Sequence, residues 1–330
     1  MKLLQKGIGI IVAAVLLAAP ALAAEPPVIR IGWSVPAQTQ HYVMMKRPDL
    51  LKNLGKSYQI EWINFPASVA IIQALASKNL DAGGVTIIPI ARTIEQRAAD
   101  LRIVADIASE RSGGFQTTWV TLESTGIKSV ADLRGKTMGV ASYGSTTDLV
   151  GRAILKRDGI DPDRDVQRVE VHFPVMEQAL RKGEVAAGEM AQPFYAAAKA
   201  RGGIRDLFTA HEILPVLPLL LEVFTEDFIT SHPEAVKGFL ADYVTALDYA
   251  RDPKNRDEVI GIVSDVTKLP RDVLASFLLT SQDYAMAPDA VPDVQAIQKT
   301  YDFLTEAGVL KTRLDAASTV DLRYNPGAKH

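Results

Sequence analysis

A short polar segment, Tyr143 to Thr146, combines residue types that can bind a small polar molecule. It lies between an expected strand and a helix expected at 145–157. Gly144 allows the backbone to approach a ligand, the hydroxyls of Ser145 and Thr146 can donate hydrogen bonds, and the first amides of a helix have no partner within it. Such a turn suits an anionic group, because the helix dipole adds to these bonds. The alternative interpretation is that Ser145 or Thr146 only caps the helix.

A second polar segment follows the first expected strand, at 28–33. Gln38, Thr39 and His41 can donate to the polar head of a ligand, and Trp33 can cover an apolar body. We expect this segment to face the same cleft, because ligands of α/β sheets bind beyond the carboxyl ends of the strands. The alternatives are that Trp33 is a core residue and that His41 is a lone histidine without a role in binding.

Two further strand ends complete the predicted site. Thr86 follows a small-residue strand in the first half of the chain, and Met190 and Gln192 end the matching strand in the second half. A neutral Gln192 and a polarisable Met190 suit a flatter or more apolar ligand. Methionine is also a common packing residue, so Met190 has a purely structural interpretation as well.

The chain carries no recognisable catalytic or metal-binding motif. Its five histidines, at positions 41, 172, 211, 232 and 330, show no HxH or HExxH spacing, and cysteine is absent. The sequence contains neither a GxSxG nucleophile turn nor a GxxxxGK[ST] phosphate loop. We therefore expect a binding protein rather than an enzyme, with no catalytic residue, no metal and no cofactor.

An imperfect internal repeat indicates how these residues are positioned. The stretch Tyr58–Val85 is echoed by Val166–Met190, and both copies contain Phe-Pro followed by Gln-Ala-Leu. Each copy reads as a strand, a helix and a small-residue strand. The repeat predicts two similar α/β lobes that face each other across a cleft.

Strands and helices alternate along most of the chain, as in open and mostly parallel sheets flanked by helices. We expect lobe 1 to comprise residues 24–114 and 222–330, and lobe 2 to comprise residues 115–221. The hinge is then formed by crossings near Gly113-Gly114 and at Leu219–Glu222. A return strand at Leu219–Thr225 leads back to lobe 1, and everything after Phe228 is helical in pattern and covers that lobe.

The N-terminus resembles a secretory signal peptide. Lys2 and Lys6 precede an apolar run at Ile8–Leu22, which ends in Ala21-Leu22-Ala23. We expect residues 1–23 to be removed and the mature chain to be soluble in the periplasm. A retained membrane anchor is the alternative, but the apolar run is shorter than the ~20 residues of a membrane span.

The composition describes a compact globular protein. Of 330 residues, 48% are hydrophobic and 23% are charged, and the formal net charge is −3. This charge gives no basic surplus for binding the phosphate backbone, so we do not expect a nucleic-acid partner. We expect a monomer.

Several longer motifs resemble a known family. They are IRIGW at Ile29–Trp33, QALASKNLDAGGV at Gln73–Val85, the segment Ser124–Thr146, ALRKGEVAAGE at Ala179–Glu189, Gln192-Pro193, and His232–Ala250. In this order they resemble the periplasmic solute-binding proteins of ABC importers for sulfonates, taurine and nitrate, a group that also contains binders of thiamine-pyrimidine precursors.

The resemblance implies a two-lobed periplasmic binding protein fold of type II-like architecture, in which the turn at 143–146 lines the cleft. It implies a receptor that binds a small, sulfonate-like organic anion and delivers it to an ABC permease in the inner membrane. Met-Ala-Gln-Pro at 190–193 departs from the family, where an aromatic and an acidic residue often precede the proline. An aromatic carboxylate or a pyrimidine therefore stays open as the ligand, as does a role in sensing for a histidine kinase.

Overall fold

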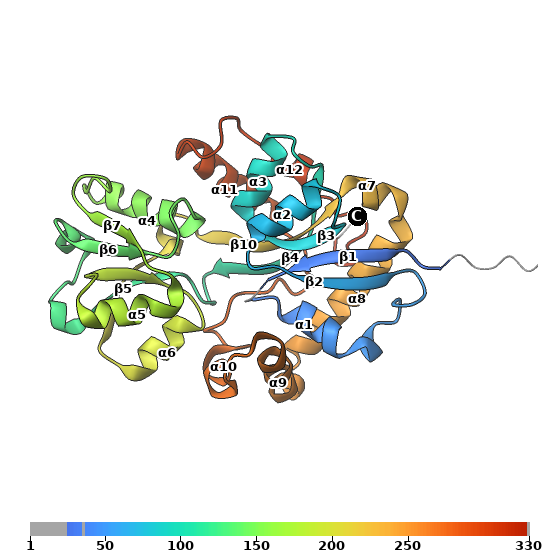
Figure 1. Cartoon of the computed structure of the whole chain (residues 1–330), viewed down its shortest axis with the longest axis horizontal. Coiled ribbons are helices and arrows are strands. Elements are labelled where there is room, and N and C mark those ends of the chain that lie inside the picture. Colours follow the sequence, from blue (N-terminus) through green and yellow to red (C-terminus); the bar gives the residue numbers. More distant parts are fainter. Residues whose placement is uncertain (1–24, 35–36, 329–330) are drawn as a thin grey trace, which may run out of the picture.

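The computed structural model describes residues 25–34 and 37–328, which form two α/β lobes that lie side by side (Figure 1). Each lobe is built on a five-stranded sheet, in the order β2-β1-β3-β10-β4 in the first lobe and β7-β6-β8-β5-β9 in the second. The strands of the first sheet are β1 (Val28–Trp33), β2 (Gln59–Asn64), β3 (Ala82–Thr86), β4 (Leu101–Arg111) and β10 (Val216–Thr225). The strands of the second sheet are β5 (Thr118–Leu122), β6 (Thr137–Val140), β7 (Gln167–Glu170), β8 (Ala187–Met190) and β9 (Ile204–Thr209).

The two sheets share one arrangement of strand directions. β1 is parallel to β2 and β3, whereas β10 is antiparallel to β3 and β4. Likewise, β6 is parallel to β7 and β8, whereas β5 is antiparallel to β8 and β9. The reversed strand in each sheet is the one that follows a crossing between the lobes. The predicted α/β class with mostly parallel sheets is confirmed, and the equal strand order shows that the repeat builds two similar lobes.

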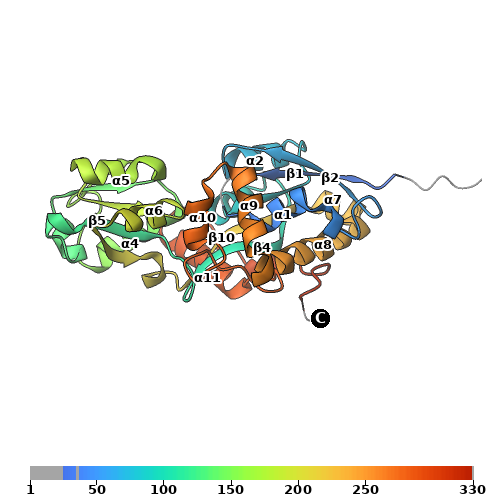
Figure 2. The same cartoon turned by 90° about the horizontal axis from the view of Figure 1, so that it is seen from below.

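Helices cover both faces of each sheet (Figures 1 and 2). One face of the first sheet is covered by α1 (Thr39–Lys46), α7 (Glu226–Ser231), α8 (Pro233–Arg251), α9 (Arg256–Thr267) and α10 (Arg271–Phe277). The other face is covered by α2 (Ser68–Ala76), α3 (Ile87–Glu95), α11 (Val294–Glu306) and α12 (Ala316–Thr319). The second sheet lies between α4 (Thr146–Arg157) on one side and α5 (Phe173–Lys182) and α6 (Phe194–Arg201) on the other. Short 3₁₀ helices occur at Pro48–Leu50, Glu123–Thr125, Val130–Leu133, Ala210–Glu212 and Pro253–Asn255.

The repeat also appears in the packing of one helix against two strands in each lobe. Ile71 of α2 lies against Gly83 of β3, which pairs with Gly32 of β1. Met176 of α5 lies in the same way against Gly188 of β8 and its partner glycine in β6. A Cβ atom at Gly83 would lie 2.7 Å from Ile71, and one at Gly188 would lie 2.4 Å from Met176. Glycine is required at both positions because the helix approaches the sheet so closely.

The return strand is longer than predicted. β10 begins at Val216 instead of Leu219, and its pairing with β4 starts at Arg111. Pro218 is tolerated inside the strand because it lies beside a shift in register, where the ladder is interrupted. The lobe boundaries at 114 and 221 stay a prediction, but the sheet membership of β10 favours a second boundary before Val216.

The segment after α10 is not helical throughout, so that part of the prediction is wrong. Residues 278–293 form no helix between α10 and α11. Ala285 instead forms a bridge with Ser109 of β4, and the carbonyl of Ala290 accepts a hydrogen bond from the amide of Asp106. These contacts satisfy backbone groups that a helix would satisfy internally.

The predicted signal peptide, residues 1–23, lies outside the residues that the structure describes. Within 25–34 and 37–328, no helix combines the length and the apolar character needed to cross a bilayer.

Candidate functional site at the junction of the lobes

The carboxyl ends of four strands point toward the junction of the lobes (Figure 1). The chain leaves the first sheet at the end of β4, and β3 runs in the direction of β4 because both are antiparallel to β10. Since β1 is parallel to β3, the ends of β1 and β3 point toward the second lobe. In the second sheet β5 enters from the first lobe, and β6 and β8 run opposite to it. The ends of β6 and β8 therefore point toward the first lobe, and the predicted site residues end or follow these four strands.

The turn after β6 is held by Asp148 in the first turn of α4. The Asp148 carboxylate accepts a hydrogen bond from the Gly144 amide at 2.9 Å and binds the Arg168 guanidinium at 2.6 Å. The Ser145 hydroxyl accepts from the Asp148 amide at 3.1 Å, so Ser145 is the N-cap of α4. Gly144 has a φ of 72°, a left-handed conformation that favours glycine.

Tyr143 and Thr146 lie on either side of this capped turn. The Tyr143 side chain is 51% exposed, its hydroxyl donates to the carbonyl of Arg168 at 3.0 Å, and its ring lies 5.5 Å from the Arg168 guanidinium carbon. Thr146 is the first residue of α4. The cap satisfies the Asp148 amide. The amides of Thr146 and Thr147, which also lie in the first turn, have no partner inside the helix. These two amides are the donors that the turn can offer to a ligand.

In the first lobe, Gln38 and His41 are buried beneath the start of α1, and neither side chain has exposed surface. His41 Nδ1 lies 2.7 Å from Gln38 Oε1, and His41 Nε2 lies 2.8 Å from a carboxylate oxygen of Glu222. Gln38 Nε2 donates to the carbonyl of Ser34 at 2.8 Å. Direct contact of Gln38 or His41 with a ligand stays a prediction, and their burial in the interior of the lobe disfavours it.

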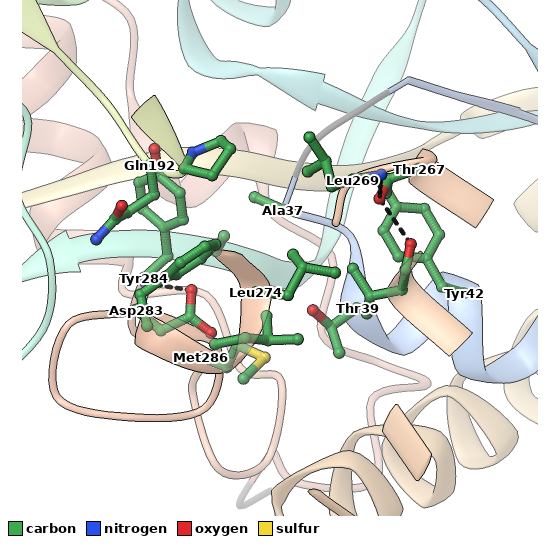
Figure 3. A pocket seen from close by; sticks show the side chains of 15 residues that line it. Ala37, Thr39, Tyr42, Gln192, Thr267, Leu269, Leu274, Asp283, Tyr284 and Met286 are labelled. Carbon is green, nitrogen blue, oxygen red and sulfur yellow. Dashed lines mark hydrogen bonds between the residues drawn. The ribbon is translucent and has the colours of Figure 1, made fainter. Parts of the chain in front are cut away.

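A narrow pocket lies between the lobes and is lined by two of the predicted site residues, Thr39 and Gln192 (Figure 3). Figure 3 shows Gln192 and Tyr284 at one end and Thr39 and Tyr42 at the other. Most of the remaining lining is apolar and comes from α9, α10 and the loops that follow each of these helices, including Leu269, Leu274, Phe277 and Met286.

The pocket has a volume of about 30 Å³, room for roughly two water molecules. This volume is smaller than the roughly 300 Å³ of a typical small-molecule pocket, so an organic ligand requires movement of the lining residues, which include Tyr42 and Tyr284. Burial raises the pKa of both phenols, so their hydroxyls stay protonated and can act as donors. Trp33 packs edge-on against Tyr42, with ring centroids 5.9 Å apart, and is partly buried.

The remaining predicted residues do not line this pocket. Met190 is fully buried in β8, and Thr86 is the N-cap residue of α3, with its amide donating to the Ser68 hydroxyl at 3.2 Å. The turn at 143–146 also lies outside the pocket. Gln192 donates from Nε2 to the carbonyl of Gln282 at 2.8 Å, which ties the second lobe to the loop after α10.

The predicted site residues did not include three buried glutamates near the junction, one of which is Glu222. Glu189 accepts from the amide of Ala141 at 2.6 Å, and Glu110 accepts from the amide and the hydroxyl of Thr117 at 2.8 and 2.6 Å. Burial raises the pKa of both Glu189 and Glu110 to about 7. A signal was available in Leu-Leu-Glu-Val and Ala-Gly-Glu-Met, because a glutamate inside an apolar strand is seldom buried without a partner.

Within residues 25–34 and 37–328, no group of three or more His, Asp or Glu side chains is arranged to hold a metal ion. Cations at the second-lobe turn are already paired, since Arg168 binds both Asp148 and Asp163. The Arg168 guanidinium at this turn is therefore already engaged by carboxylates.

Comparison with known proteins confirms the resemblance inferred from the sequence. The putative aliphatic sulfonates-binding protein of Escherichia coli (strain K12) is 26% identical over 297 residues, which cover 89% of each chain. The crystal structure of the periplasmic aliphatic sulphonate binding protein SsuA from Escherichia coli superposes with a TM-score of 0.74 at 23% identity, over 92% of this chain and 95% of that one. The alkanesulfonate-binding protein SsuA from Xanthomonas axonopodis pv. citri, bound to MOPS, gives a TM-score of 0.70 at 23% identity, over 91% and 100%. These structures share the fold described above.

The match to a protein family extends over most of the chain. Residues 22–264 fit the model of the NMT1-like family, a range that includes both crossings between the lobes and all the predicted site residues. The protein therefore belongs to the NMT1-like family.

Proposed function

We propose that the protein is the solute receptor of an ABC importer and that it captures a small organic anion with a sulfonate-like head between its two lobes. The observation that carries this proposal is the convergence of four strand ends, each followed by the start of a helix, at the lobe junction. The sulfonate-binding names of its relatives support the same class of ligand.

The arrangement suits an anion for an electrostatic reason. Helices α1, α3, α4 and α6 follow β1, β3, β6 and β8 respectively, so their partly positive N-termini lie on the sides of the lobes that face each other. The free amides of Thr146 and Thr147 give the anion two specific donors. Asp148 already occupies part of the α4 terminus, and its pairing with Arg168 offsets its charge there.

The apolar lining of the pocket in Figure 3 favours a ligand with an organic body. Nitrate has no apolar surface, so its contact with Leu274, Phe277 and Met286 would give no hydrophobic stabilisation. An alkyl or aryl sulfonate has both an anionic head and an apolar body. An aromatic carboxylate is the second candidate, because it presents the same two parts.

Ligand contacts to both lobes would stabilise a closed state, and only this differential contact shifts the equilibrium between open and closed forms. In this proposal the mature chain begins at Ala24, is monomeric, works in the periplasm without a cofactor or a catalytic step, and presents its closed form to a permease in the inner membrane.

A thermal-shift screen of the purified chain from residue 24 onward tests the ligand class. We expect ethanesulfonate, taurine and longer alkanesulfonates to raise the melting temperature, since a ligand at a hundred times its dissociation constant adds about 2.7 kcal/mol to the free energy of unfolding. Ethyl methyl sulfone is the matched control, because it keeps the shape and lacks the charge. Stabilisation by a pyrimidine or by the sulfone, with no effect of any sulfonate, would contradict the proposal.

A further inference from the structure

Each lobe places one buried glutamate beneath a helix start, namely that of α1 after β1 in the first lobe and that of α4 after the equivalent strand β6 in the second lobe. Glu222 on β10 lies under the start of α1, and Glu189 on β8 contacts the turn before α4. Both side chains are 0% exposed. A carboxylate is costly to bury unless its partners compensate, so its presence at equivalent places in two lobes calls for a role there.

In the first lobe, one ion-pair contact and two hydrogen-bond contacts form a chain from Glu222 to the backbone before α1. The carbonyl of Ser34 can only accept, so the Gln38 amide group turns its nitrogen toward Ser34 and its oxygen toward His41. His41 Nδ1 must then carry a proton and donate to Gln38. The other ring nitrogen, Nε2, lies 2.8 Å from a carboxylate oxygen of Glu222, within ion-pair distance. Glu222 therefore lies against one side of the His41 ring, and the other side of the ring contacts Gln38, the N-cap residue of α1.

In the second lobe, the contact between the glutamate and the turn is direct. One carboxylate oxygen of Glu189 accepts the Ala141 amide at 2.6 Å. Ala141 is the first residue after β6, and Ser145 caps α4 four positions later. Glu189 thus anchors the beginning of the turn whose end offers the free amides of Thr146 and Thr147.

The two glutamates lie on strands that are not equivalent in the repeat. Duplication of one sequence segment therefore does not explain why both lie beneath a helix start. Glu222 on the reversed strand β10 is paired in register with Gly84 of β3, whereas Glu189 on β8 is paired with Trp119 of the reversed strand β5. Gly84 leaves room for Gln38, whose oxygen would lie 2.7 Å from a Cβ atom at this position. Each lobe therefore has a carboxylate beneath its turn, and the two carboxylates are carried by strands that are not equivalent in the repeat.

We propose that Glu222 and Glu189 are positioning residues of the ligand site, which hold the starts of α1 and α4 from the core side and so direct the donors of these turns toward the ligand. Their effect on ligand affinity rests on the proposed function, whereas their effect on the two helix starts does not. Gln38 and His41 then act on the ligand indirectly, as the link between Glu222 and α1.

Paired substitutions separate positioning from simple loss of stability. Glu222→Gln and Glu189→Gln keep a side chain that can hydrogen-bond His41 or Ala141, whereas Glu222→Met and Glu189→Met keep the volume and lose the bond. Asp242→Leu is the matched control, because Asp242 is also buried and accepts from the amides of Lys52 and Asn53, before the amino end of β2 and away from the junction.

Hydrogen exchange of the ligand-free proteins, followed by mass spectrometry, measures how well the backbone amides at the starts of α1 and α4 are protected. The Tyr42 amide, bonded to the carbonyl of Gln38, and the Leu149 amide, bonded to that of Ser145, lie in the two reporting segments. We expect exchange at the start of α1 to be about tenfold faster in Glu222→Met and exchange at the start of α4 to be about tenfold faster in Glu189→Met. The Gln variants should stay close to the wild type, and Asp242→Leu should change neither segment selectively.

Calorimetry with ethanesulfonate provides the second readout. Each Met variant should bind about tenfold more weakly than its Gln counterpart, with Asp242→Leu unchanged at a temperature where all variants are folded. Equal exchange at the helix starts in the Met, Gln and Asp242→Leu proteins would overturn the positioning role, as would unchanged affinity of the Met variants. If the wild type binds no sulfonate, the proposed ligand class is wrong, and the exchange data alone decide the role of the two glutamates.

Discussion

Thr146 is the residue at which donation to an anion can be removed with the least damage to the fold. It is the first residue of α4, where proline is well tolerated, and Ser145 before it has φ −66° and ψ 162°, a conformation that suits a residue preceding proline. We predict that Thr146→Pro weakens ethanesulfonate binding by about tenfold or more, because it removes an amide and a hydroxyl from a charged acceptor. The free energy of unfolding should change by less than about 1 kcal/mol, as measured by guanidinium denaturation.

Val294→Pro is the control for this substitution. Val294 is the first residue of α11, and its N-cap Asp293 is likewise in an extended conformation. Calorimetry should show native affinity in this variant. If Thr146→Pro also retains native affinity, the α4 turn does not bind the ligand head.

The buried acids predict a specific dependence of stability on pH. The pKa of Glu189 and of Glu110 is raised to about 7 by burial, while the unfolded chain releases these protons near pH 4.3. Between about pH 4.5 and pH 7 the folded state holds more protons than the unfolded state, so the free energy of unfolding falls as pH rises through this range and then levels off. Asp106 and Asp283, each with a pKa raised to about 6 by burial, add a contribution of the same sign.

Glu189→Gln isolates one part of this effect, because the amide is neutral at every pH. Denaturation at about pH 5 and about pH 8 should show a smaller loss of stability in this variant than in the wild type. An unchanged difference would mean that Glu189 titrates near its ordinary value.

The sequence allowed us to predict which residues lie near the junction more reliably than which side chains surround them. The polar character and chain position of Ser145 and Thr39 led to the junction, where the structure places them. The burial of His41 could not be foreseen, because it depends on Glu222, which lies far away in the sequence and comes close only after β10 returns from the second lobe.

At the scale of elements, the two lobes repeat one packing of helix on sheet, and this repetition predicts an order of mutational effects. Gly83→Ala should destabilise the protein more than Gly188→Ala, within the roughly 1–3 kcal/mol typical of overpacking. The new methyl group at Gly83 meets the stiff side chain of Ile71 and the carbonyl of Gly32 at 3.0 Å, whereas at Gly188 it meets the flexible Met176.

Urea denaturation of the two variants tests this order. The second-site change Met176→Ala should recover part of the stability lost in Gly188→Ala, because the two residues are in contact. The reverse order of destabilisation would show that the two helix contacts are not equivalent in the way that the repeat indicates.

The elements themselves follow closely from the sequence where a local pattern specifies them. Alternation of strands and helices and the repeated Phe-Pro and Gln-Ala-Leu motifs were sufficient to predict both sheets. The pattern failed where partners distant in sequence decide the conformation. The return strand was expected to begin at Leu219, but β10 includes Pro218 beside a register shift, and the backbone of Ala285 pairs with β4 where a helix was expected.

At the scale of the whole molecule, two crossings join the lobes, one after β4 and one before β10. At the first crossing, the Glu110 carboxylate accepts a hydrogen bond from the Thr117 amide, and the amide of Phe115 donates to the carbonyl of Asp283 at 2.7 Å. Elsewhere the lobes contact each other through the hydrogen bond from Gln192 to Gln282 and through side-chain packing, such as that of Leu149 of α4 and Phe303 of α11 against the clusters of the opposite lobes. We propose that the lobes rotate about these crossings.

Small-angle scattering with and without a saturating sulfonate measures such a rotation. We predict a smaller radius of gyration with the ligand, because contacts to both lobes favour the closed form. Ethyl methyl sulfone should leave the scattering curve unchanged. An equal radius with and without a ligand of proven affinity would indicate a receptor that is closed before binding.

The central claim is that the junction of the lobes binds an organic anion, and calorimetric titration of the purified chain with ethanesulfonate tests it most directly. We predict saturable binding of one ligand per chain, with an affinity that falls by about tenfold or more in Thr146→Pro and is native in Val294→Pro. Absence of binding to ethanesulfonate, taurine and longer alkanesulfonates, or binding that is equally strong for ethyl methyl sulfone, would contradict the claim.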